Sequence, residues 1–80
     1  MHEYFENVKA DALKSLRLLT GQDVEDSFDD VRKAVWWVKC HGNRMQACLA
    51  KEAAWDYRWA RHEIAAHEAE KKKAPATVAK

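Results

Sequence analysis

The sequence has few residues that interrupt helices, with only 2 glycines and 1 proline among 80 residues. No uncharged stretch approaches the ~18 apolar residues that a membrane-spanning helix needs, and no basic start leads into an apolar secretory signal. With only 2 cysteines, we expect a soluble, cytoplasmic protein with free thiols and no membrane partner. A Cys40–Cys48 disulfide would need a sharp turn at Gly42–Asn43, and the spacing alone leaves that alternative open.

Motifs for catalysis and for metal binding are also missing from the sequence. There is no glycine-rich phosphate loop and no nucleophile elbow. His62 and His67 are five residues apart, whereas a zincin helix needs two histidines four apart on one face. Cys40 and Cys48 lack the paired spacing of structural zinc sites. We therefore expect no enzyme activity, no cofactor and no metal.

The composition predicts an all-helical globular chain with nearly balanced charge. Hydrophobic residues make up 48%, and good helix formers such as Ala, Leu, Glu and Lys are well represented. The 14 basic and 13 acidic residues leave a net charge of +1, whereas a binder of duplex nucleic acid should be plainly basic.

A first helix is expected over residues 2–20. Apolar residues recur there at three- and four-residue steps, as on one face of a helix: Phe5, Val8, Ala12, Leu16 and Leu19. Leu13 widens this face and Leu18 lies away from it. Gly21 follows and suits a left-handed C-terminal cap.

A second helix is expected over residues 23–41, with Asp23 as its N-cap. Ser27 and Asp30 match a capping box, so the start could instead lie one turn later. The helix carries an apolar stripe typical of a coiled coil: Val24, Phe28, Val31, Val35 and Val38.

A third helix is expected over residues 44–72. Gly42 suits the end of the second helix, and Asn43 with Gln46 suits an N-cap pair for the third. The alternative is one unbroken helix from residue 23 to residue 70, which would place Gly42 and Glu52 at core positions.

The third helix has two apolar stripes separated by acidic residues. One stripe contains Cys48, Trp55, Trp59 and Ala66. The other contains Leu49, Ala53, Tyr57, Ala60 and Ile64. The residues between them are Glu52, Asp56 and Glu63. A helix of this kind needs two different neighbours, so we predict a three-helix antiparallel bundle that is completed by homodimerisation. Residues 1–70 form its single domain, and residues 71–80 form a basic, disordered tail.

Trp36 and Trp37 point away from the predicted stripe of the second helix, in directions about 100° apart. A large exposed aromatic side chain on a small protein is unfavourable, so one or both should be covered. They are either core residues of one compact monomer or anchors of an interface, where Trp and Arg are typical.

The predicted function is protein–protein interaction, by a regulator or inhibitor that occludes a surface of a larger factor. The predicted partner-binding residues are Trp36, Trp37, Trp55, Tyr57, Arg58, Trp59 and Arg61, and Arg44 and Lys51 extend the charged face. In style the chain resembles small phage- or mobile-element-encoded proteins that block a host factor.

The alternative is binding of single-stranded nucleic acid by the Trp-, Tyr- and Arg-rich helix. It is weakened by the expectation that Arg58 and Arg61 face away from the stripe of Trp55 and Trp59, because a stacking platform needs rings and charge on one surface.

Overall fold

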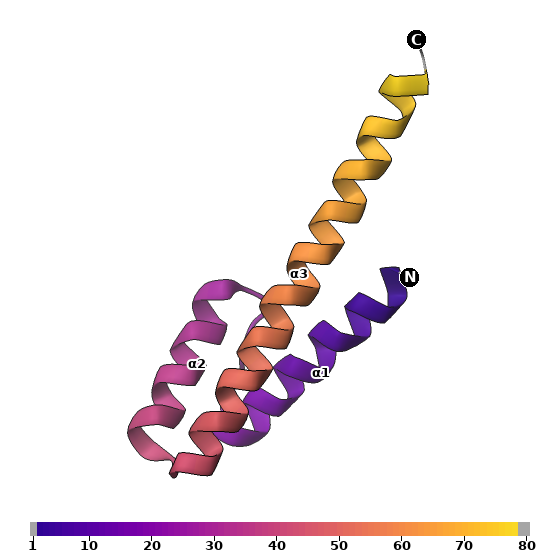
Figure 1. The fold of residues 1–80 in the computed structure, drawn as a ribbon. Helices are drawn as coiled ribbons and strands as arrows, with labels where there is room; N and C mark the ends of the chain where they lie inside the picture. Colours follow the sequence, from indigo (N-terminus) through magenta and orange to yellow (C-terminus); the bar gives the residue numbers. More distant parts are fainter. Residues whose placement is uncertain (1, 79–80) are drawn as a thin grey trace.

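The computed structural model describes the backbone of residues 2–78 and the side chains of residues 3–70. It contains three helices, α1 (His2–Thr20), α2 (Phe28–His41) and α3 (Arg44–Val78), and no strand in the described part of the chain (Figure 1). The all-helical fold class and the helical bundle agree with the prediction from sequence.

The two shorter helices both run antiparallel to α3 and therefore run parallel to each other (Figure 1). Phe5, near the start of α1, packs with Ala60 and Ile64 of α3, while Phe28, at the start of α2, contacts the ring of Tyr57. The connection between α1 and α2 therefore runs back along the bundle. The bundle is thus antiparallel where α1 and α2 pack on α3, whereas α1 and α2 are parallel to each other.

α2 begins at Phe28 rather than next to Asp23. Ser27 is the N-cap, with extended backbone, and its hydroxyl accepts a hydrogen bond from the Asp30 amide at 3.2 Å. The later start weighed from the capping box is therefore the correct one. The physical reason is that residues 21–27 are needed to return the chain to the other end of the bundle.

Three local contacts hold this connection in place. Gly21 has a φ of 68° and its amide donates to the Arg17 carbonyl at 2.8 Å, which confirms the left-handed cap. The Arg17 guanidinium donates to the Val24 carbonyl at 2.9 and 3.2 Å. The Val24 side chain is buried in the core, so the connection contributes to packing although it is not helical.

The break between α2 and α3 falls at Gly42–Asn43, and the unbroken helix is ruled out. The Asn43 amide donates to Gln46 Oε1 at 2.9 Å, and the Gln46 amide donates to Asn43 Oδ1 at 2.8 Å. Gly42 has extended backbone, so its φ does not require glycine. A Cβ atom there would lie 2.8 Å from both the Val38 carbonyl oxygen and Gln46 Oε1, so glycine is required by space.

The core lies on one side of each helix. The predicted α1 face is confirmed, with Leu13 also buried and Leu18 exposed. On α2 the buried residues are Val31, Ala34 and Val38. Phe28, which belonged to the predicted stripe, is half-exposed, and Ala34, which did not, is buried.

On α3 one of the two predicted stripes is the core. Its buried residues are Ala50, Ala53, Tyr57, Ala60 and Ile64. Ala50 takes the place expected for Leu49, which is half-exposed. The other predicted stripe lies outside the core and is exposed, and within it Trp59 contacts Tyr4 and Phe5 of α1.

α3 continues to Val78, beyond the predicted end near residue 72. The side chains beyond Glu70 lie outside the described residues. The basic, disordered tail expected over residues 71–80 therefore stays a prediction.

We expect Gly21→Ala to lower the free energy of unfolding by about 1 kcal/mol, because L-residues with a side chain disfavour left-handed backbone. No atom lies within 4 Å of the added methyl group, so backbone strain is the only cost. Thermal unfolding followed by circular dichroism should show a melting temperature lowered by roughly 4–8 °C. Gln22→Ala, an exposed neighbour, is the control, and an equal loss there would contradict the explanation.

Candidate functional site

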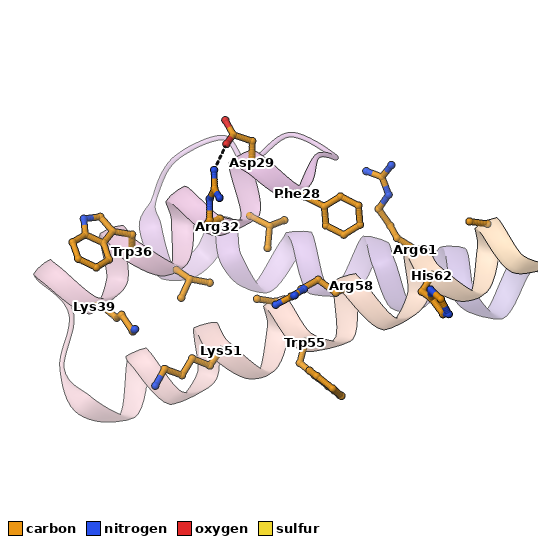
Figure 2. Close-up of a pocket in the computed structure, with 14 residues that line it drawn as sticks. Phe28, Asp29, Arg32, Trp36, Lys39, Lys51, Trp55, Arg58, Arg61 and His62 are labelled. Atoms are coloured by element: carbon orange, nitrogen blue, oxygen red, sulfur yellow. Dashed lines mark hydrogen bonds and ion pairs between the residues drawn. The ribbon is translucent and has the colours of Figure 1, made fainter.

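A groove lies between α2 and α3, and we call it the basic groove (Figure 2). Its volume of about 1150 Å³ exceeds the roughly 300–1,000 Å³ of typical small-molecule pockets. It is lined by Phe28, Asp29, Val31, Arg32, Val35, Trp36, Lys39, Lys51, Ala54, Trp55, Arg58, Arg61, His62 and Ala65.

The lining of the basic groove carries an excess of positive charge. Its permanently cationic residues are Arg32, Lys39, Lys51, Arg58 and Arg61, against the single carboxylate of Asp29. Asp29 already accepts a bond from Arg32 at 2.8 Å and pairs with Lys33 at 3.2 Å. These bonds lower the pKa of Asp29, with Lys33 as the main cause. No ion pair within the described residues involves Lys39, Lys51 or Arg58.

Aromatic side chains stand at the edges of the same groove. Trp36 on α2 is 66% exposed and Trp55 on α3 is 69% exposed. Figure 2 shows Trp36 on α2 and Trp55 on α3, with the Trp55 ring directed away from α2. At one end the guanidinium carbon of Arg61 lies 4.6 Å from the centre of the half-exposed Phe28 ring.

A polar network fixes Arg61 and ties the groove to the rest of the bundle. The Tyr57 hydroxyl donates to Asp26 Oδ1 at 2.6 Å, and Arg61 Nη1 donates to the same hydroxyl at 2.8 Å. Lys9 Nζ of α1 lies 2.8 Å from Asp26 Oδ2. Asp26 in the connection therefore joins α1 and α3 beside the first residue of α2.

This network shifts the pKa values of its members. Burial opposes the charged form of Asp26, but the hydrogen bonds from Lys9 and Tyr57 together with the nearby positive charges outweigh it, so the pKa of Asp26 is lowered. The hydrogen bond to Asp26 raises the pKa of Lys9. Burial and then the same carboxylate raise the pKa of Tyr57. Asp26 and Lys9 are therefore held charged, and Tyr57 neutral, at pH 7.

The predicted binding residues divide among three places. Trp36, Trp55, Arg58, Arg61 and Lys51 line the basic groove. Tyr57 is fully buried and belongs to the core, so we remove it from the binding set. The remaining three lie outside the groove, and they are Trp37, Trp59 and Arg44.

The environments of Trp37 and Trp59 explain their separation from the groove. Trp37 is partly buried against the core and stacks on the His41 ring, with centroids 4.6 Å apart. Trp59 is 41% exposed and makes edge contacts with Tyr4 and Phe5 of α1, at centroid distances of 6.5 and 5.1 Å. The Trp36–Trp37 pair is thus split between surface and core.

Sequence reasoning missed two features of the site. Arg32 and Lys39 were not singled out, because only the packing of α2 on α3 shows that they share a groove with Lys51. Asp26 is absent from the predicted site residues, because nothing in the local sequence connects it with Tyr57, 31 residues away. Trp55 also lines the groove with Arg58 and Arg61, but in Figure 2 the Trp55 ring points away from α2 and the Arg61 side chain points toward it.

A second, shallower groove between α1 and α3 has the opposite charge, and we call it the acidic groove. Its charged residues are Asp11, Glu52 and Asp56, and its apolar residues include Leu18, Leu19 and Leu49. α3 therefore presents cations toward α2 and carboxylates toward α1.

No protein family model, curated protein or solved structure matches this chain.

Two further observations concern the described residues alone. They contain no helix long and apolar enough to cross a membrane. They also bring together no group of three or more His, Cys, Asp or Glu side chains suited to a metal ion, and Cys40 and Cys48 are both free and exposed.

We expect Asp26→Asn to lower the free energy of unfolding by about 1 kcal/mol at pH 7. The effect is smaller than for a buried ion pair, because the carboxylate is about half-exposed and solvent screens its charge. The folded-state pKa of Asp26 is lowered, so its contribution exists above its unfolded-state pKa and is lost as the pH falls through the folded-state pKa. The difference between variant and wild type should therefore shrink between about pH 5 and pH 2.

Thermal unfolding across this pH range tests the expectation. Asp23→Asn is the matched control, because no hydrogen bond or ion pair within the described residues involves the Asp23 carboxylate. A loss for Asp26→Asn that is constant with pH would contradict the ionic role of Asp26.

Proposed function

We propose that this chain is a non-enzymatic protein-interaction module that regulates or inhibits a larger factor by covering part of its surface, and that it acts as a homodimer. The basic groove is the binding surface. Its ligand is an acidic segment of the other protein with an apolar face. The observation that carries the proposal is the placing of two exposed indoles, Trp36 and Trp55, on the edges of a cationic groove.

The chemistry of the groove supports a protein ligand. Tryptophan and arginine are the most frequent energetic anchors of protein interfaces, because they bury large areas and make directional bonds. Lys39, Lys51 and Arg58 form no ion pair within the described residues, so their positive charges would attract an acidic partner.

The extent of the groove also favours a macromolecule. Its walls run from Phe28 to Lys39 on α2 and from Lys51 to Ala65 on α3. At 1.5 Å per residue the α2 wall is about 16 Å long, which is three turns of a bound helix. A helix laid in such a groove contacts it at every third or fourth residue.

The homodimer is supported by the surface that the single chain leaves uncovered. A core of this size rarely supplies more than roughly 3–5 kcal/mol, so small domains often gain stability by association. Trp55, Leu49 and Met45 of α3 are all exposed.

The first test is Trp36→Ala in a capture experiment with the native host's lysate. Wild-type protein should enrich one acidic protein, identified by mass spectrometry, and the variant should bind that protein at least roughly tenfold more weakly. Helix content should be unchanged, because Trp36 is mostly exposed. Leu18→Ala is the matched control, since Leu18 is also exposed but lies in the acidic groove. Equal capture by wild type and Trp36→Ala would refute the groove as the binding surface.

Single-stranded nucleic acid is the second candidate ligand, and one observation favours it. The lining of the groove includes both Trp55 and the cations of Arg58 and Arg61, and binding of single strands combines aromatic rings with a cationic groove.

Fluorescence anisotropy with a pool of single-stranded oligonucleotides distinguishes this candidate. If the groove's cations neutralise about five phosphates, affinity should fall roughly 100-fold between 50 and 200 mM salt. Lys39→Ala should weaken binding and reduce the salt dependence, whereas Lys14→Ala on α1 should do neither. The absence of salt-dependent binding at 50 mM would remove nucleic acid from consideration.

A further inference from the structure

The side of α3 that faces away from the bundle carries an exposed apolar stripe, which we call the α3 ridge. It consists of Cys48, Trp55, Trp59 and Ala66, separated by seven, four and seven residues, and all four are exposed. This spacing is typical of a helix that packs along a second helix. In the single chain only Trp59 has an aromatic neighbour from another helix, through Tyr4 and Phe5.

Opposite charges flank the α3 ridge. The basic flank, Lys51 and Arg58, lies on the side of the basic groove. The acidic flank, Glu52 and Asp56, lies on the side of the acidic groove. No ion pair within the described residues involves any of these four side chains.

This segregation has a cost within one chain. Glu52 and Asp56 are four residues apart on the helix surface, where like charges repel. No ion pair joins the two flanks within the described residues. Both flanks therefore lack a counter-charge that a second molecule could supply.

We propose that the α3 ridge is the interface of a parallel homodimer, with the two α3 helices side by side and a twofold axis parallel to them. This inference rests on the proposed homodimer and gives its geometry. A twofold axis along the helices places the basic flank of one copy against the acidic flank of the other at the same height. Lys51 then faces Glu52 of the second copy, Arg58 faces Asp56 of the second copy, and both pairs occur twice.

The antiparallel arrangement fails on charge. A twofold axis perpendicular to α3 places each flank against the same flank of the other copy, so acids meet acids and bases meet bases. Contact between like charges across the interface disfavours the antiparallel dimer. Burial of the indoles would contribute equally to the affinity of the parallel and the antiparallel dimer. Charge therefore selects the parallel dimer.

The parallel dimer leaves part of the basic groove accessible. Trp36, Arg32 and Lys39 project from α2 and are not part of the ridge (Figure 2). Dimerisation covers Trp55 and pairs Lys51 and Arg58 with the second copy, so a ligand of the dimer is bound by the α2 wall of the groove, where Trp36 is the exposed indole.

Cysteine cross-linking tests the direction of the helices, because Cys48 lies on the ridge. In a Cys40→Ser background, mild oxidation should join two Cys48 side chains in a parallel dimer. An antiparallel dimer centred between Trp55 and Trp59 would instead place Cys48 opposite Ala66 of the second copy. In the parallel dimer Ala66 faces Ala66 of the second copy, so a Cys40→Ser, Cys48→Ser, Ala66→Cys variant should also cross-link with itself. Cross-linking only in a mixture of the two variants would overturn the proposal.

Charge reversal tests the pairing of the flanks. Glu52→Lys with Asp56→Lys makes both flanks basic, and Lys51→Glu with Arg58→Glu makes both acidic. Each double variant alone should dimerise at least about tenfold more weakly than wild type, since several close charge pairs become repulsive. An equal mixture of the two should recover the wild-type affinity. Lys14→Glu on α1 is the control for a charge reversal outside the flanks.

Sedimentation equilibrium at low salt supplies the readout, and circular dichroism confirms that each variant is folded. A wild-type chain that stays monomeric at about 1 mM would overturn the proposal, as would a dimer unaffected by both reversals. The variant with two basic flanks keeps Trp36 and every cation of the basic groove. This variant should therefore lose the dimer but still capture the acidic protein that Trp36→Ala binds more weakly. The two results together separate a failure of the dimer geometry from a failure of the proposed function.

Discussion

The bundle depends on one stripe of α3 against which both shorter helices pack. Ala50, Ala53 and Ala60 are small and almost fully buried, so the backbones of α1 and α2 can approach closely, while the Tyr57 ring fills the space between them. Because both neighbours lie on the same side, the opposite side of α3 is left without one. The two grooves and the ridge are the direct consequences of this one-sided packing.

The rotation of α3 about its own axis decides which charges face which neighbour. Tyr57 is the only large fully buried aromatic side chain of the described core, and its hydroxyl bonds Asp26 in the connection. This bond sets the rotation of α3 against the start of α2. With that rotation fixed, Arg58 is directed toward α2 and Asp56 toward α1. A turn of α3 by one residue, about 100°, would remove this division.

Local signals predicted most of the helix boundaries and half of the site. The capping pair at Asn43 and the left-handed cap at Gly21 act within one turn, so sequence alone located both. The return of the chain between α1 and α2 depends on Val24 and on distant contacts of Asp26, which no local pattern reveals. For the same reason the sequence left open whether Trp36 and Trp37 are core or interface residues, and it did not show that Arg32 and Lys39 share a groove with Trp36.

The return connection also determines the order in which contacts can form. α2 and α3 are joined by a turn at Gly42–Asn43, so their mutual contacts are close in sequence and cost little loop-closure entropy. The contacts of α1 with α3 join Phe5 to Ile64, across almost the whole described chain. Loop-closure entropy therefore favours formation of the α2–α3 hairpin before α1 packs onto it. Ligands of the α2–α3 face would then meet their surface on a chain that has not yet finished folding.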